Sequence, residues 1–195
     1  DINALETAVE IMSQAPRGRL YKALVETGLA NDVFAYPLSA RCPSFAVFVA
    51  QLDKDGDENA VREAMIRTVE GALQAEPATE EEVRIQLSEA ATDYARSLSD
   101  PEEFAVGLSD YIALGDWRMS FVDRDATARV TPADVNRAAA AYFVRDNRAA
   151  GVFIPDAEPR REPAMATPDV AGIVARASFK AEGDRAEAFD VSQDN

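Results

Sequence analysis

Apolar side chains recur every three or four residues in several stretches of the chain, which is the spacing of one face of an α-helix. The stripes, in chain order, are Val61, Met65, Val69, Ala72 and Leu73; Val83, Leu87, Ala90, Ala91, Tyr94 and Leu98; Phe104, Leu108, Tyr111 and Ile112; and Val135, Ala138, Ala139 and Tyr142. We expect all of these stripes to face the hydrophobic core.

Residues that begin helices stand in front of these stripes. Thr79 and Glu82 have the spacing of a capping box, in which a hydroxyl and a carboxylate each satisfy a free backbone N–H. Asp100-Pro101 and Thr131-Pro132 each combine a capping side chain with proline at the first helical position. The sequence therefore predicts helices that begin after Thr79, Asp100 and Thr131.

Two stretches, residues 32–38 and 45–52, are rich in aromatic and β-branched residues and are predicted to pair as an antiparallel hairpin. Residues 149–154 are predicted as a third strand. Three strands make a thin sheet beside so many helices, so we expect further strands of the native sheet upstream of Asp1. The predicted fold class is α+β, with helices packed on a sheet that contains antiparallel strands.

The amino-acid composition of the chain changes near its end, where charged residues are interleaved with Pro155, Pro159, Pro163 and Pro168. Such a composition suits an extended linker. We therefore predict one module over residues 1–155 and a Pro-rich connector over residues 156–195. Within the connector, residues 170–177 are expected to form a helix that docks back, and residues 180–195 to be mobile.

The charge balance limits the partners. Counting 20 Lys and Arg against 35 Asp and Glu gives a formal net charge of −15. Such a surface repels phosphate backbones and anionic lipid headgroups, so no nucleic acid and no membrane surface is expected as a partner. Apolar runs such as residues 45–50 are far shorter than the roughly 20 residues of a membrane span. The compartment stays open between periplasm and cytoplasm.

The chemistry-bearing residues are few. Histidine is absent from the chain, which removes histidine-based dyads, triads and the usual zinc sites. The single cysteine, Cys42, follows Arg41, a cation that favours a thiolate, but no imidazole can act as its base. We expect a small, half-buried thiol at the start of a strand. No catalytic residue, metal ligand or cofactor is predicted in this chain.

The turn Asp53-Lys-Asp55-Gly56-Asp57 has the alternating carboxylates that a calcium ion prefers. With Asp53 as loop position one, however, glycine falls at position four instead of six, and Ala64 stands where an EF-hand has its glutamate. A solvated turn in which Asp57 caps the following helix fits better. A calcium-binding module is therefore kept only as a third hypothesis.

Several short segments resemble a known family. They are RLYKALVE at 19–26 with GLA at 28–30, SL at 97–98 with DPEEFA at 100–105, ALGDWR at 113–118, VTPADV at 130–135 with AY at 141–142, DNR at 146–148 and FIP at 153–155. In this order and spacing they resemble the non-catalytic module of M16-type peptidases, the family of pitrilysin, insulin-degrading enzyme and mitochondrial processing peptidase. The resemblance covers about residues 2–190 and is greatest to the bacterial two-half type.

The resemblance implies an α/β module whose sheet is covered by helices, with pairs of modules facing one another across a closed chamber. In this family the catalytic module holds Zn²⁺ through the inverted motif H-x-x-E-H and a downstream glutamate. No segment of this chain matches the motif, so no catalytic or metal residue is carried over. The resemblance places Ile2 inside the second module, before its first long helix, and the Pro-rich tail at the connector towards the next half.

Some family members present an arginine and a tyrosine from a non-catalytic module to the substrate near the zinc. The positions that match here by spacing are Val25 and Asn31, so this contact is not carried over. Arg19 and Tyr21 are the candidate substrate-wall or interface residues. The alternative is that both side chains pack or snorkel at the helix surface.

These inferences predict a non-catalytic module of a zinc-dependent M16 metalloendopeptidase, which forms part of the peptide-enclosing chamber and of the intermodule interface. The implied partners are other modules of the same polypeptide or a partner M16 subunit, together with a peptide substrate; zinc is expected in the catalytic module of the parent protein. An alternative is an interaction or scaffold module of an inactive homologue or non-catalytic subunit. An exposed sheet edge would also allow a homodimer, and the chain alone is expected to be inactive.

Overall fold

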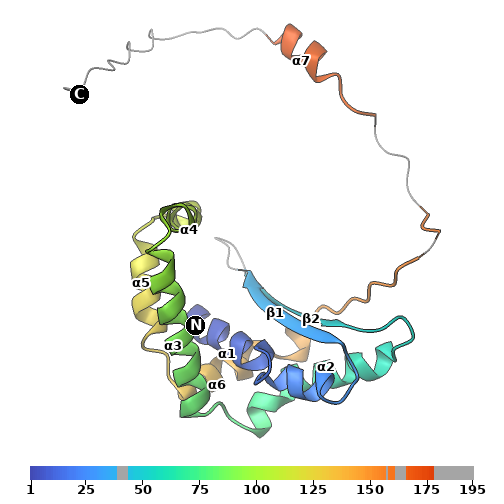
Figure 1. Ribbon diagram of the computed structural model, residues 1–195, viewed down its shortest axis with the longest axis vertical. Coiled ribbons are helices and arrows are strands. Elements are labelled where there is room, and N and C mark those ends of the chain that lie inside the picture. Colours follow the sequence, from blue (N-terminus) through green and yellow to red (C-terminus); the bar gives the residue numbers. More distant parts are fainter. Residues whose placement is uncertain (39–43, 157, 161–165, 178–195) are drawn as a thin grey trace. The chain divides into compact units, whose positions relative to one another are not determined.

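The computed structural model describes residues 1–38, 44–156, 158–160 and 166–177. The chain divides into two compact units, Asp1–Ala150 and Gly151–Asn195. The elements of the first unit are α1 (Ile2–Ser13), η1 (Tyr21–Val25), β1 (Asp32–Leu38), β2 (Phe45–Gln51), α2 (Glu58–Ala75), α3 (Glu80–Ser97), α4 (Pro101–Leu114), α5 (Met119–Thr127), α6 (Pro132–Tyr142) and η2 (Arg145–Asn147) (Figure 1). The described part of this unit is mostly helical with one antiparallel pair of strands, which confirms the predicted α+β class.

The hairpin confirms the strongest strand prediction. β1 and β2 pair in antiparallel register from Asp32 opposite Gln51 to Leu38 opposite Phe45. The third predicted strand is wrong, because residues 149–154 form no strand pairing among the described residues. Their aromatic and β-branched composition favours an extended backbone, but a strand also needs a neighbouring strand to satisfy its N–H and C=O groups. In this segment Phe153 is 89% exposed.

The core lies between the hairpin and the helices on one side of it, with α1 at its centre (Figure 1). Successive strand residues point to opposite faces, so Val33 of β1 is buried against the core while its neighbour Phe34 is partly exposed. The buried cluster draws on α1, η1, β1, α2, α3 and α6; its members are Ala8, Val9, Ile11, Met12, Leu20, Leu24, Ala30, Val33, Val61, Ala64, Leu73, Ala78, Val83, Val135, Ala139 and Phe143.

The predicted helix starts are confirmed by their capping bonds. Thr79 accepts a hydrogen bond from the Glu82 N–H at 3.2 Å, and the Glu82 carboxylate accepts one from the Thr79 N–H at 2.9 Å. Thr131 forms the same reciprocal box at the start of α6. Asp57 and Asp100 each accept two backbone N–H groups, at the starts of α2 and α4. Local side-chain chemistry therefore fixes where these helices begin.

The predicted burial of two apolar stripes is wrong. α4 contains no buried residue, and Ile112 is 61% exposed. In α3 only Val83 is fully buried and Leu87 packs against the core, whereas Leu98 at the other end is 53% exposed. The physical reason is that α3 extends beyond the core and carries α4 with it, so these stripes have no core to face and stay partly exposed.

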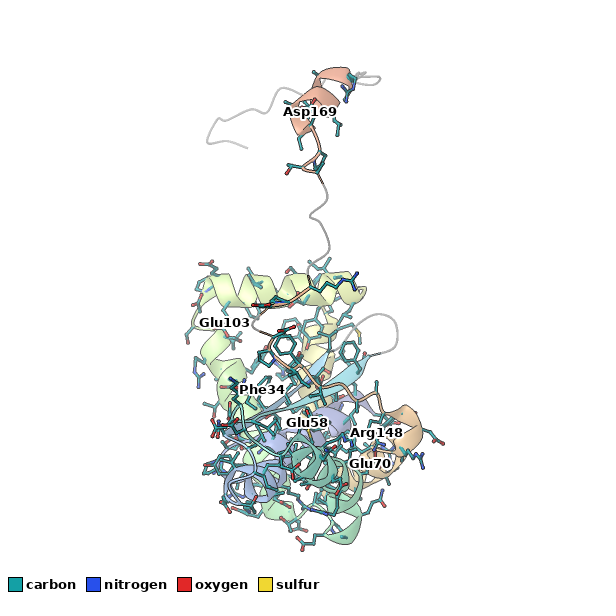
Figure 2. All side chains as sticks on the ribbon, turned by 90° about the vertical axis from the view of Figure 1, so that its right-hand side faces the viewer. Phe34, Glu58, Glu70, Glu103, Arg148 and Asp169 are labelled. Carbon is teal, nitrogen blue, oxygen red and sulfur yellow. The ribbon has the colours of Figure 1, made fainter. Side chains whose placement is uncertain are left out.

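Arg148, the residue after η2, is joined to α2 by an ion pair. The Arg148 guanidinium donates to the Glu70 carboxylate of α2, and the two side chains lie together in Figure 2. Both are at least two-thirds buried, with side-chain exposures of 31% and 24%. This contact connects the chain that follows α6 to the helix beside the hairpin.

In the second unit, α7 (Val170–Arg176) confirms the predicted helix, and Asp169 accepts the Gly172 N–H at its start. The docking of this helix, the connector assignment for residues 156–195 and the module boundary at residue 155 stay predictions. The predicted thiol Cys42 and the segment 180–195, predicted to be mobile, lie outside the described residues. No helix among the described residues is both long and apolar enough to cross a membrane.

Candidate functional site

Arg19, which lies just before η1, connects α2 and α3 of the first unit. Its guanidinium donates to the carbonyl oxygen of Ala72 at 3.0 Å and to that of Glu76, at the C-terminus of α2. It also contacts the Glu82 carboxylate of α3, with Nη2 3.1 Å from Oε2. The side chain is only 12% exposed. The planar guanidinium thus bridges the end of one helix and the start of the next, a geometry that a single ammonium group does not provide.

The charge of Arg19 acts on Glu82. Burial alone would raise the pKa of the Glu82 carboxyl group, but hydrogen bonds from the Thr79 N–H and from the Arg19 guanidinium hold this pKa below its usual value. Glu82 therefore stays ionised while it serves both the capping box and the ion pair.

Tyr21 begins η1, a π-helical turn closed by the Glu26 N–H donating to the Tyr21 carbonyl at 3.1 Å. Its ring is half-buried against the core, next to the fully buried Leu20 and Leu24. The turn ends at Gly28, whose φ of +73° is a left-handed conformation that favours glycine. The two predicted residues are thus neighbours in the chain, with Arg19 directed to α2 and α3 and Tyr21 at the edge of the core.

The structure also describes Val25 and Asn31, the two positions that match the family's substrate-contacting pair by spacing. Val25 packs partly buried against the core. Asn31 is exposed and donates from Nδ2 to the Asp53 carboxylate at 2.8 Å. Val25 has no polar group, and the Asn31 amide is bound to the turn after β2. Neither residue reproduces the arginine and tyrosine chemistry of the family pair.

A zinc site does not fit this chain. The sequence has no histidine, and the described residues contain no group of three or more His, Cys, Asp or Glu side chains arranged to hold a metal ion. In the turn that resembles a calcium loop, the Asp57 carboxylate caps α2 through the N–H groups of Asn59 and Ala60. This confirms the capping role predicted for Asp57.

The outer face of the hairpin is a surface that the sequence reasoning missed. The register puts Phe34 opposite Val49, Tyr36 opposite Val47 and Leu38 opposite Phe45, all on the face turned away from α1. The rings of Phe34 and Tyr36 are stacked, with centroids 6.4 Å apart. Figure 2 shows Phe34 on the hairpin. Phe34, Tyr36, Leu38 and Phe45 are 38–56% exposed. Both faces of this hairpin are therefore apolar, and the signal in the sequence was a nearly unbroken apolar run without polar alternation.

A second surface is polar and acidic. A cavity of about 290 Å³ lies between α1 and α3, and four of its lining residues are carboxylates: Glu6, Glu10, Glu89 and Asp93. Burial raises the pKa of the Glu10 carboxyl group, and the charges of Glu89 and Asp93 raise it further. No pattern in one segment predicts this cavity, because α1 and α3 are separated by more than sixty residues of chain.

The described residues contain no cluster of His, Cys, Asp and Glu side chains that could hold a metal ion, and comparison with known proteins places the fold among the inactive domains of peptidases. A family model described as "Peptidase M16 inactive domain" matches residues 1–88. The inactive peptidase domain of a candidate zinc protease from Bordetella parapertussis is 39% identical, with a TM-score of 0.75, covering 83% of this chain and 86% of that chain. A candidate zinc protease from Bordetella pertussis is 38% identical, with a TM-score of 0.74 and coverages of 79% and 85%.

A protease from Helicobacter pylori shares the fold with a TM-score of 0.65 at 18% identity, and the match covers 73% of this chain and 34% of that one. No curated protein matches the sequence. The similarity to the Bordetella domains extends over most of both chains. This chain belongs to the M16 peptidase family and is an inactive peptidase domain of that family.

Proposed function

We propose that this chain is the non-catalytic module of a zinc-dependent M16 metalloendopeptidase, where it forms part of the peptide-enclosing chamber and of the interface with neighbouring modules. The proposal is supported by the outer face of the β1–β2 hairpin. Six apolar side chains lie together there, opposite the face that covers the core. Large contiguous apolar patches on a folded unit mark sites of protein contact.

A second copy of the chain is a poorer occupant of this face than another module. With about 200 Å² per large side chain, the exposed parts of Phe34, Tyr36, Leu38 and Phe45 add up to roughly 400 Å². Two such faces would bury about 800 Å², below the roughly 1,200 Å² of a stable interface. Each copy also carries a net charge of −15, which opposes self-association.

Under this proposal zinc is bound by another module of the parent protein, which would carry H-x-x-E-H. Arg19 and Tyr21 are proposed to lie at the chamber wall or at the module interface. Arg19 would act there by fixing the junction of α2 and α3, since its guanidinium is occupied by Ala72, Glu76 and Glu82. The negative charge of the module would favour basic peptides by long-range attraction, an effect that salt screens.

The test uses the complete parent protein. Phe34→Ser combined with Tyr36→Ser should lower peptide hydrolysis at least about tenfold, because polar hydroxyls would replace apolar contact at the interface. The control is Val106→Ser with Ile112→Ser, which changes two exposed apolar residues on α4, away from the hairpin. Equal activity of the two double variants would contradict the interface role. Chelator-sensitive peptide hydrolysis by the isolated chain would contradict the non-catalytic assignment.

The alternative is an interaction or scaffold module of an inactive homologue or of a non-catalytic subunit. The two proposals differ in where the H-x-x-E-H motif lies, in the same polypeptide or only in a partner. The zinc content and coding sequence of the parent protein distinguish them. A homodimer through a sheet edge is a further proposal, which light scattering of the chain at high concentration tests: a monomer throughout would reject it.

A further inference from the structure

The second half of α3 together with α4 and α5, residues 88–127, is named the arm. No apolar residue of the arm belongs to the buried cluster or packs against it; Leu87 is the last α3 residue that does. α4 and α5 contain no buried residue at all. Figure 1 shows α3 and α5 side by side with α4 across their far ends. The arm is therefore attached to the core without being part of it.

Aromatic contacts hold the arm together internally. The Trp117 and Phe121 rings meet edge to face, with centroids 5.9 Å apart. The Arg124 guanidinium lies 5.2 Å from the ring centre of Tyr94 on α3 and 5.6 Å from that of Phe121 on α5. Cation–π contacts of this kind join α5 to α3. The arm is thus expected to move as one piece.

Between α1 and the arm lies the cavity of about 290 Å³. Carboxylates face it from both sides, Glu6 and Glu10 from α1 and Glu89 and Asp93 from α3. At one end Gln14 and Gln86 join the two helices, with Gln86 Nε2 donating to Gln14 Oε1 at 2.8 Å. Arg17 pairs with Glu89 and Arg96 pairs with Asp93, which offsets part of the negative charge on α3. The charges of Glu89 and Asp93 still act on Glu10 of α1, and this repulsion pushes α3 away from α1.

A polar latch closes the other end of the cavity. Asn3 of α1 donates from Nδ2 to Asp123 Oδ1 at 2.6 Å and to Thr127 Oγ1 at 2.9 Å, both on α5. The Tyr111 hydroxyl of α4 donates to the second oxygen of Asp123 at 2.8 Å. One carboxylate therefore connects α1, α4 and α5.

We propose that the arm is a hinged element that opens away from α1 when the Asn3–Asp123 latch breaks, with its hinge near Gln14 and Gln86. The carboxylates that line the cavity favour the open state, and raised salt favours the closed state by screening them. Opening exposes the cavity side of α1, including Thr7, which is 5% exposed in the closed state.

Thiol labelling of the whole chain, with Cys42 replaced by serine, tests this proposal. Thr7→Cys places a thiol on the cavity wall, and Ser13→Cys is the matched control, since Ser13 is 6% exposed on the same helix but does not line the cavity. Thr7→Cys should react at least about tenfold faster than Ser13→Cys. Adding Asp123→Ala should speed Thr7→Cys alone by about tenfold or more, because it removes charged hydrogen bonds. Asp110→Ala, an exposed carboxylate of α4, should change neither rate.

A second variant that is expected to slow labelling keeps the proposal testable even if Asp123→Ala fails to fold. Asp93→Asn removes one of the repelling charges and should slow labelling of Thr7→Cys about threefold, and so should an increase in salt. Equal labelling rates for Thr7→Cys and Ser13→Cys would overturn the proposal, because both would then report global unfolding. So would a Thr7→Cys rate that neither Asp93→Asn nor salt changes.

Discussion

Replacing Arg19 by methionine is expected to destabilise the fold although the residue carries no known chemistry. Methionine keeps the length of the aliphatic stem but removes every N–H donor. The carbonyl oxygens of Ala72 and Glu76 at the end of α2 would lose their partner, and Glu82 would lose its opposite charge. Because the side chain is only 12% exposed, water can replace these bonds only in part.

The expected loss follows from the number and kind of these bonds. A hydrogen bond to a charged group contributes about 1.5–3 kcal/mol, and bonds that share one guanidinium are not additive. We therefore expect Arg19→Met to lower the free energy of unfolding by about 2–4 kcal/mol, which corresponds to a fall in Tm of roughly 5–12 °C for a unit of this size. Arg19→Lys should recover less than half, since one ammonium group cannot bridge both helices.

Thermal and urea unfolding followed by circular dichroism measure this loss. Arg17→Met is the control: Arg17 pairs with Glu89 but is 55% exposed, so its loss should cost no more than about 0.5 kcal/mol. The pH dependence adds a second readout. The lowered pKa of Glu82 contributes stability that is present above its unfolded-state value of about 4.3 and is lost as the pH falls below it. Arg19→Met should weaken this acid sensitivity. A fall in Tm below about 2 °C would refute the bridging role and leave the guanidinium available for a peptide.

Three further outcomes are expected. Asp57→Ala should lower the free energy of unfolding by about 1 kcal/mol in urea denaturation, because α2 loses its N-cap; an unchanged midpoint would contradict the cap. Glu10→Gln should stabilise the chain at pH 7 and have little effect near pH 4. Burial, and then repulsion from α3, raises the pKa of Glu10, so its ionisation as the pH rises costs stability; a variant less stable than the parent at pH 7 would reject this. Val33→Ala should cost about 2 kcal/mol and Tyr36→Ser less than half of that, since only Val33 faces the core; equal losses would mean that the outer face is already covered.

The helix starts could be predicted because their causes are local. A capping side chain and the N–H that it accepts lie within three residues, so the spacing of Thr79 and Glu82 already contains the interaction. The hairpin could also be predicted from the sequence, since both strands are short and close to each other along the chain. The predictions that were wrong concern features that depend on contacts between residues far apart in the sequence. Residues 149–154 have strand composition without a paired neighbour, and the apolar stripe of α4 has helical spacing without the core to face.

The candidate surfaces were harder to predict than the fold. Arg19 was singled out by resemblance, but its partners lie more than fifty residues away along the chain, and no local pattern indicates them. The latch of Asn3 and Asp123 is likewise formed by residues 120 positions apart. Polar side chains of this kind have no periodicity in the sequence. The contacts of these polar side chains can be identified only from the three-dimensional arrangement of the helices.

The outer face of the hairpin was missed for a different reason. Its residues were correctly assigned to strands, but the composition of a strand does not say what covers each of its two faces. Charged residues make up 28% of the chain, so six surface positions drawn at random would include about two of them. The six outward positions between the Asp32–Gln51 pair and the turn, from Phe34 to Phe45 in register, include none. In a chain with a net charge of −15, a charge-free apolar face is better explained by contact with another protein surface than by exposure to water.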